Sequence, residues 1–196
     1  MSAGDITNNP KAQYTPTLLA RYRSEIVPAM KVQFNYSAAL AVPRLVKIVI
    51  NMGVKEAVND AKFTEKAAEE LAVIAGQKAK ICRARKPISN FKLKKGMPIG
   101  CCVTMRRYRM YEFLERFIAT ASPRIRDFRG FSSHGFDGRG SYNFGLLEQN
   151  IFPELELDKI TRTQGMTITI HTSAKTDKEA KALLDLLGFP FRKQAR

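Results

Sequence analysis

Apolar residues recur at intervals of three and four positions in four segments, which predicts four helices. The four apolar stripes are Leu18, Tyr22, Ile26 and Met30; Phe63, Ala67, Leu71 and Ile74; Met110, Leu114, Phe117, Ile118 and Ala121; and Ala180, Leu183, Leu184 and Leu187. Because most helical stability in proteins comes from packing of an apolar side, each helix is expected to bury its stripe in a core.

Residues that favour helix ends flank these stripes. Thr15-Pro16 favours a helix start, and Pro28 is expected to bend or end this first helix. The segment from Thr176 to Glu179 has the pattern of a capping box, in which both side chains bond backbone N–H groups of the first turn. The other helix limits are expected at Asn59 or Asp60, Gly76, Pro123, Gly188 and Pro190.

Apolar and polar residues alternate in other segments, which predicts strands with two different faces. Strands are expected near residues 44–51, 78–84, 99–107 and 166–171. In the first of them, Val46, Ile48 and Ile50 are expected to face the core. The opposite face would carry Lys47, Val49 and Asn51 from the first strand, and Gly100, Cys102, Thr104 and Arg106 from the third.

These elements predict an α+β fold: a largely antiparallel sheet with helices packed on one face and the other face free. The chain has 196 residues, of which 44% are hydrophobic, and this suits a single compact domain with its own core. We expect this domain to span residues 14–193, and the polar, aperiodic residues 1–13 to form a flexible extension. Residues 123–153 are assigned only by composition, which is rich in Gly, Arg and aromatic residues.

Positive charge is concentrated in one segment. Leu71 to Tyr111 contains eleven Lys and Arg and no acidic residue, so it supplies +11 of the formal net charge of +15. Pro87, Gly96 and Pro98 interrupt the run, which favours a protruding basic loop at residues 83–96 between two strands. A face that is merely solvated is the alternative explanation for such a run.

The pI near 10.0 indicates a polyanionic partner, either nucleic acid or an anionic membrane surface. A peripheral membrane protein would need a basic amphipathic helix, and Pro and Gly break the basic run here. No apolar run reaches the ~20 residues of a spanning helix, and the N-terminus lacks the features of a signal peptide. We therefore expect a cytosolic protein without a membrane partner.

A free polar sheet face beside a basic loop suits RNA. The shallow minor groove of an RNA helix presents hydroxyl groups to short polar side chains, and its phosphates attract Lys and Arg. Lys47, Asn51, Thr104 and Arg106 are the residue types that such a face requires. The same pattern also fits a face that is exposed only to solvent, and the residues alone leave both possibilities open.

Patterns typical of catalysis or metal binding are weak. His134 and His171 have no spacing that suggests a metal site or a nucleophile–base pair, and 138–140 does not match a nucleotide-binding loop. The three cysteines lack a C-x-x-C spacing and are expected to be reduced thiols in the core. We therefore expect no enzyme activity, cofactor or metal, although an RNA-modifying enzyme would share the charge.

Several segments carry a family resemblance. They are PRIRDFRGFS at 123–132, FDGRGSYNFG at 136–145, EQNIFPE at 148–154, PRLVKIVINMGV at 43–54, GQK at 76–78, the loop at 83–100 and GFPFRK at 188–193. Together they closely resemble the family of ribosomal protein five of the large subunit, over about residues 20–193. The chain departs from the family at Val46, Lys55 and Ser141, where Glu, Gly and Asn are common.

The resemblance implies a non-catalytic protein of the central protuberance that binds 5S rRNA and helps attach it to the large subunit, with large-subunit rRNA as a further partner. It also implies contacts with peptidyl-site tRNA and, in an intersubunit bridge, with ribosomal protein thirteen of the small subunit. By the resemblance, Asn51, Gln77 and Thr104 would bind 5S rRNA, and the loop from Arg83 to Lys95 would reach the tRNA.

Pattern and resemblance together predict two sites. The 5S rRNA site comprises Lys47, Asn51, Gln77, Lys78, Thr104 and Arg106. The tRNA-binding loop comprises Arg83, Arg85, Lys86, Ser89, Asn90, Lys92, Lys94 and Lys95.

Overall fold

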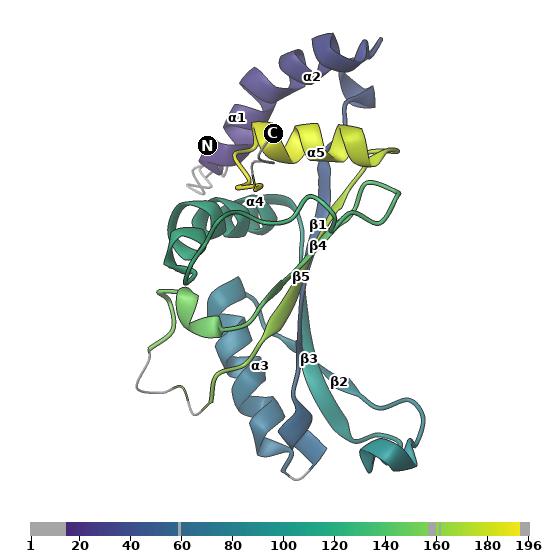
Figure 1. Cartoon of the computed structure of the whole chain (residues 1–196), viewed down its shortest axis with the longest axis vertical. Helices are drawn as coiled ribbons and strands as arrows, with labels where there is room; N and C mark the ends of the chain where they lie inside the picture. Colours follow the sequence, from purple (N-terminus) through teal and green to yellow (C-terminus); the bar gives the residue numbers. More distant parts are fainter. Residues whose placement is uncertain (1–14, 59, 157–159, 161, 193–196) are drawn as a thin grey trace, which may run out of the picture.

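The computed structural model describes residues 15–58, 60–156, 160 and 162–192 (Figure 1). Five strands form one antiparallel sheet in the order β2-β3-β1-β5-β4. The strands are β1 (Leu45–Gly53), β2 (Lys80–Arg83), β3 (Pro98–Met105), β4 (Tyr142–Leu146) and β5 (Met166–Thr172). The predicted antiparallel sheet is confirmed, and β4 adds an edge strand that lies within the segment at 123–153. The expected extension at 1–13 lies outside the described residues.

The four predicted helices are present. The α-helices are α1 (Thr17–Arg21), α2 (Val27–Phe34), α3 (Lys62–Ala75), α4 (Arg107–Arg116) and α5 (Asp177–Leu186). A π-helical segment, Tyr22–Ile26, joins α1 to α2, and a second one, Phe117–Ala121, extends α4. All residues of the four predicted stripes are buried except Phe63 and Ile118, which are half-buried at the edge of the core.

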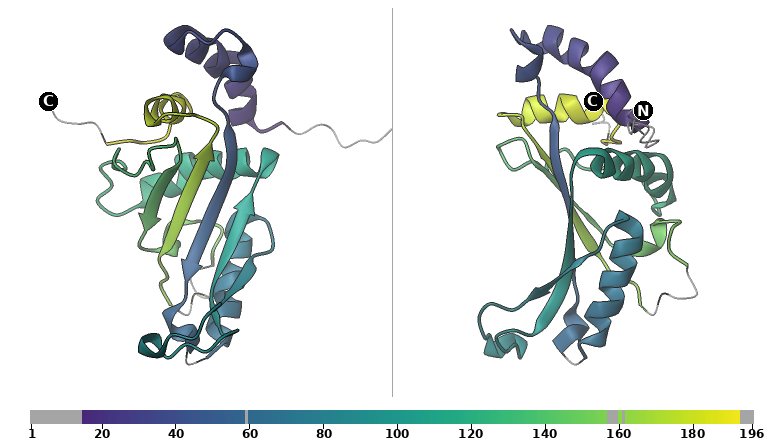
Figure 2. Two further views of the ribbon diagram at one scale, coloured as in Figure 1. Left: turned by 90° about the vertical axis from the view of Figure 1, so that its right-hand side faces the viewer. Right: turned by 180° about the vertical axis from the view of Figure 1, so that it is seen from behind.

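Helices cover one face of the sheet and leave the other free, as predicted. α3 and α4 lie against the same face, while α5 crosses the end of the sheet near the start of β1, with α1 and α2 beyond it (Figures 1 and 2). The covered face is apolar because Ile48, Ile50 and Met52 of β1 pair with Met105, Val103 and Cys101 of β3, and all six are buried. Burial of this apolar area is the main stabilising contribution to the fold.

Pro28 does not end the first helix. The chain remains helical to Phe34, and the turn immediately before the proline is the π-helical segment. In an α-helix the proline ring would collide with the carbonyl four residues earlier, and a wider turn is one recognised way to accommodate it. The N–H of Val27 accordingly bonds the carbonyl of Tyr22, five residues earlier.

The predicted helix ends are largely observed. The cap position of α3 is Ala61, one residue after the predicted Asp60, whose carboxylate accepts a hydrogen bond from the Lys62 N–H at 2.9 Å; Asn59 lies outside the described residues. Gly76 ends α3 with φ of +62°, a left-handed conformation that glycine adopts without a side-chain clash. Both hydrogen bonds of the capping box between Thr176 and Glu179 are present.

The predicted orientation of Val46 is wrong. Its side chain is 40% exposed, and the neighbouring Leu45 is buried in its place. The pairing register of β1 with β5 shifts between Leu45 and Lys47, which marks a bulge. An extra residue at a bulge reverses the face on which the preceding side chains lie, so strict alternation fails there.

Candidate nucleic-acid interface

The free face of the sheet carries aligned rows of mostly polar side chains. The strand pairing places Asn143, Thr169, Val49 and Thr104 in one row; Thr167, Asn51, Cys102 and Lys80 in a second; and His171 and Lys47 in a third. Arg106 follows the last residue of β3 and extends the third row. Neighbours in a row lie about 5 Å apart at Cβ, so they can contact one ligand together. The structure thus brings together Lys47, Asn51, Thr104 and Arg106, and we call this surface the free face.

Two polar side chains in the middle of the free face have no partner within the described parts of the chain. Asn51 is exposed and Thr104 is half-buried, and neither side chain forms a hydrogen bond there. By contrast, Thr169 donates a hydrogen bond of 2.6 Å to Asn143 at the edge of the same face. Asn51 and Thr104 therefore keep their donors and acceptors available for a ligand.

Gln77 and Lys78 lie at the C-terminal end of α3, beside β3. The amide nitrogen of the Gln77 side chain donates to the backbone carbonyl of Thr104 at 3.2 Å. This bond fixes the position of the amide and leaves its oxygen as an acceptor. Lys78 is exposed in the short connection to β2. The structure therefore places Gln77 next to Thr104, although the side-chain NH2 group of Gln77 already forms a hydrogen bond within the fold.

His171 belongs to the free face, and sequence reasoning did not select it. Its Nδ1 lies 3.1 Å from the hydroxyl of Ser141. Burial lowers the pKa of His171, and the charges of Lys47 and Arg106 lower it further, while Asp137 acts in the opposite direction. The imidazole is therefore neutral at pH 7, so it offers the free face a polar group but no additional positive charge. The sequence did contain a signal for this position: apolar Ile168 and Ile170 alternate with Thr169 and His171, which indicates that His171 faces away from the core.

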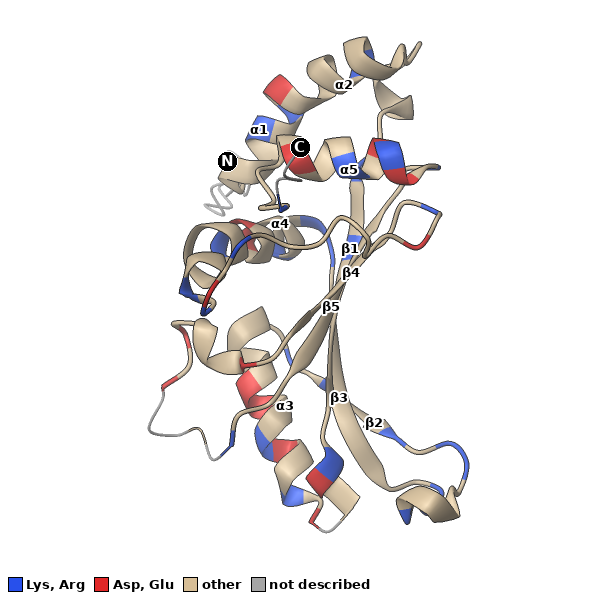
Figure 3. Cartoon of the chain, in the orientation of Figure 1, with Lys and Arg blue, Asp and Glu red and all other residues tan. Residues whose placement is uncertain are grey.

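The predicted basic loop is an extended ribbon that joins β2 to β3 and projects beyond the sheet (Figures 1 and 3). Backbone hydrogen bonds between Ala84 and both Gly96 and Met97 continue the pairing of the two strands, and Ile88 bridges Leu93 nearer the tip. The tip is a short 3-10 turn, Ser89–Phe91. All eight predicted tRNA-contacting residues are exposed.

The cysteines correct one prediction. Cys101 is buried, as expected, but Cys82 and Cys102 are half-buried on the free face, with their Sγ atoms 3.5 Å apart. β2 is an edge strand, and its pairing places Cys82 opposite Gly100 and Lys80 opposite Cys102. Both thiols are therefore part of the polar side of the sheet and not of the core.

The described residues contain no cluster of three potential metal ligands among His, Cys, Asp and Glu. No helix among them is long and apolar enough to cross a membrane.

Comparison with known proteins identifies the family of the chain. The family model for ribosomal protein L5 matches residues 39–94, and the model for the C-terminus of the same ribosomal family matches residues 98–191. The chain is 57% identical over 171 residues to large ribosomal subunit protein uL5 of Geobacter sulfurreducens, which covers 87% of this chain and 96% of that protein. It is 50% identical over 187 residues to uL5 of Kocuria rhizophila, which covers 95% of this chain and 99% of that protein.

These similarities define the class of the protein: it is a structural constituent of the large ribosomal subunit, and its family is not one of enzymes. More specifically, the chain belongs to the ribosomal protein L5 family, whose bacterial members carry the name uL5. The family and the absence of an enzymatic role are as predicted from the sequence.

Proposed function

We propose that the protein binds 5S rRNA through its free face and thereby attaches this RNA in the central protuberance of the large subunit. Asn51, Thr104 and the side-chain oxygen of Gln77 would hydrogen-bond ribose hydroxyls and base edges. Lys47, Lys78 and Arg106 would neutralise the adjacent phosphates.

The observation that carries this proposal is the pair of unpartnered polar side chains at the centre of the free face. Asn51 and Thr104 lie in adjacent rows on neighbouring strands. Lys80 lies in the row of Asn51, and Lys47 lies in the row on the other side of Thr104. A solvated face would need no such organisation, because water can satisfy polar groups in any arrangement. RNA requires hydrogen-bonding groups at fixed positions between cations.

Asn51→Ala and Thr104→Val should each weaken 5S rRNA binding without unfolding the protein. Each change leaves a group of the RNA without its partner, which costs about 1 to 3 kcal/mol, or roughly 5- to 150-fold in Kd. The melting temperature should change little, because both side chains point away from the core. Binding of 5S rRNA can be measured by filter retention at fixed salt, with melting followed by circular dichroism.

Thr163→Val is the matched control, because Thr163 is exposed and lies outside the free face. Its affinity for 5S rRNA should equal that of the wild type. The proposal is wrong if either test variant unfolds more easily while the molecules that remain folded bind 5S rRNA with full affinity. That result would mean that the side chain stabilises the core and does not contact the RNA.

We further propose that the basic loop contacts peptidyl-site tRNA, and that the protein takes part in a bridge to ribosomal protein thirteen of the small subunit. The loop suits a second RNA because it extends away from the sheet and exposes five cations whose removal takes no side chain from the core, namely Arg83, Arg85, Lys86, Lys92 and Lys94. Its exposed Phe91, at 67%, adds a ring on which a base can stack.

Replacing these five cations with Ala should weaken retention of peptidyl-site tRNA by assembled ribosomes. The free energy of unfolding should change by no more than about 0.5 kcal/mol per site, since the side chains are exposed. Binding to isolated 5S rRNA should lose only its diffuse electrostatic part, because Asn51, Gln77 and Thr104 are untouched. The measurement is the rate of tRNA dissociation from reconstituted ribosomes at matched salt.

A control variant should remove five exposed lysines outside the loop: Lys31, Lys55, Lys62, Lys178 and Lys181. It has the same net charge as the loop variant and should retain tRNA like the wild type. An unchanged tRNA dissociation rate for the loop variant, together with a collapse of its 5S affinity, would assign the loop to the 5S site.

A further inference from the structure

A cleft of about 650 Å³ lies beside the free face, between α1 with its π-helical extension, the start of β1, and the start of α4. Four arginines line it: Arg23, Arg44, Arg106 and Arg107. Arg106 and Arg107 belong to the basic run, but Arg23 and Arg44 lie outside it, so the run did not reveal the four as a group. In the left view of Figure 2, which faces the free side of the sheet, these elements meet where β1 extends past the end of β3.

The four guanidinium groups are free to bind an anion. Within the described parts of the chain none of them takes part in an ion pair, and all four residues are exposed. Four unpaired cations around one concave surface repel each other, and a bound polyanion would relieve this repulsion. Their planar groups can each form two hydrogen bonds to a phosphate.

The cleft also has aromatic walls. Tyr22 and Tyr111 form its buried side, with ring centroids 6.4 Å apart, and Tyr108 is 50% exposed at its rim. Burial raises the pKa of Tyr111 to about 12, Tyr22 adds to this rise, and the positive charges of Arg44 and Arg23 oppose it. An accessible ring beside cations is the arrangement on which an unpaired base stacks while its phosphate is held.

The backbone at the cleft is strained. Arg107 has φ of +54°, in the left-handed region that a long side chain rarely occupies. Such conformations cost free energy and are retained where the surrounding structure or a function requires them. Here the conformation turns the chain sharply from β3 into α4, so that Arg106 and Arg107 both line the cleft.

We propose that this arginine cleft holds an unpaired nucleotide of the same RNA that occupies the free face, with its phosphates on Arg23 and Arg44 and its base on Tyr108. The cleft has the volume of a small-molecule site, so it can admit a nucleotide but not a double helix. Arg106 joins the two surfaces, because it lines the cleft and also extends the row of Lys47 and His171 on the free face. The proposal rests on 5S rRNA binding by the free face and adds a second, single-stranded element to its recognition.

The test is 5S rRNA binding by Arg23→Ala/Arg44→Ala, which leaves the free face and Arg106 intact. Affinity should fall roughly ten- to hundredfold, as expected when two charged hydrogen-bonding partners are lost. The slope of log K against log salt should become less steep by about 2, because two phosphate contacts disappear. The matched control is Lys31→Ala/Lys62→Ala, which removes the same charge from exposed positions outside the cleft. This control should change affinity less than about threefold, since it removes only diffuse attraction.

Tyr108 separates stacking from charge. Tyr108→Phe keeps an aromatic ring and should bind 5S rRNA like the wild type, whereas Tyr108→Ala should lose roughly tenfold. Hydroxyl-radical footprinting should show one backbone segment that is protected by the wild type and exposed in both the arginine double variant and Tyr108→Ala.

The possible failures are distinguishable. If the wild type does not bind 5S rRNA, the proposed function itself is wrong. If the wild type binds and the double variant matches its control in affinity, salt slope and footprint, the cleft holds no RNA. Circular dichroism of each variant excludes unfolding as the cause of any loss.

Discussion

Raising the salt concentration from 50 to 200 mM should weaken the binding of this protein to 5S rRNA by roughly 60- to 1,000-fold. Each phosphate neutralised by Lys or Arg releases condensed counterions, so engagement of ~4 to 6 phosphates gives a slope of roughly −3 to −5 in log K against log salt. The net charge of +15 and its concentration in one segment are the basis of this expectation. Filter binding over a series of salt concentrations measures the slope directly.

The same salt series should leave the fold intact, because the described surface ion pairs are few and contribute little. Melting curves at 50 and 200 mM salt therefore serve as the control. A slope near zero would contradict the electrostatic argument and would mean that the basic residues of the loop and the free face do not reach phosphates.

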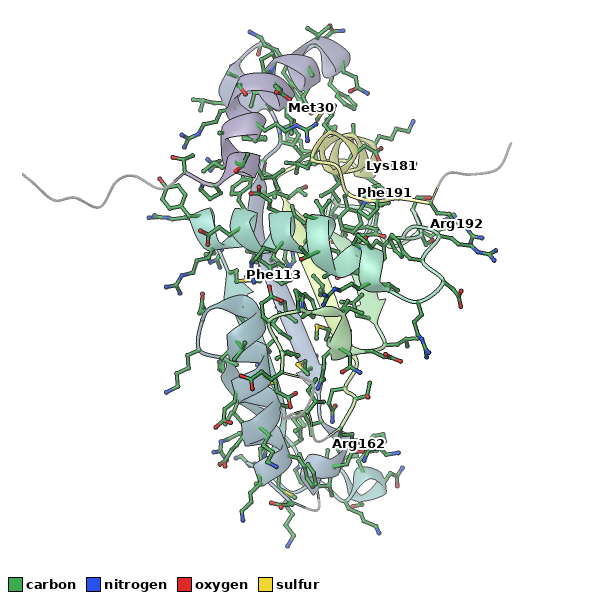
Figure 4. The ribbon with its side chains drawn as sticks, turned by 90° about the vertical axis from the view of Figure 1, so that its left-hand side faces the viewer. Met30, Phe113, Arg162, Lys181, Phe191 and Arg192 are labelled. Atoms are coloured by element: carbon green, nitrogen blue, oxygen red, sulfur yellow. The ribbon has the colours of Figure 1, made fainter. Side chains whose placement is uncertain are left out.

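Phe117→Ala should lower the free energy of unfolding by about 3 to 5 kcal/mol, the range for removal of a buried aromatic side chain. Phe117 is 1% exposed and lies where α4, which crosses in front of the sheet in Figure 4, continues as a π-helix. Its ring centroid lies 5.3 to 6.3 Å from those of five other phenylalanines: Phe113, Phe131, Phe144, Phe152 and Phe189. Urea unfolding followed by circular dichroism gives the change.

Phe91→Ala is the matched control for this substitution, because Phe91 is exposed at the tip of the basic loop. Its stability should stay within about 0.5 kcal/mol of the wild type. If both variants unfold at the same urea concentration, the aromatic cluster does not stabilise the fold as described. RNA binding by Phe117→Ala should persist below its unfolding transition, since the free face does not include this residue.

The aromatic cluster also shows what periodicity could not predict. Helical spacing in the sequence correctly placed Phe117 on a buried stripe. Its partners, however, come from β4, from residues near Phe131 and from Phe189 near the C-terminus, and they meet only in the folded chain. In β4, buried Tyr142, Phe144 and Leu146 alternate with exposed Asn143 and Gly145. This strand has only five residues, however, and such a short pattern is a weak signal for a strand in a glycine-rich segment.

The free face was predictable in composition but not in arrangement. Alternation along β1 and β3 correctly placed Asn51 and Thr104 away from the core. Their relative position depends on the register, which pairs Asn51 with Cys102 and Val49 with Thr104. A shift of two residues would keep both side chains on the free face but place other residues beside them, and no local pattern fixes that choice between distant segments. The arginine cleft combines residues from three separate segments, and only Arg106 and Arg107 lie in the basic run.

The distribution of charge over the two sides of the sheet has a kinetic consequence. On the covered side, α3 carries Glu65, Glu69 and Glu70, whereas the basic loop beside it has only cations, as Figure 3 shows. This separation gives this part of the molecule an electric dipole. Under the proposed RNA binding, the field of a polyanion would turn the loop and the free face toward the RNA before contact. Productive encounters would thereby be more frequent than random collision allows, and salt would act mainly on the association rate constant.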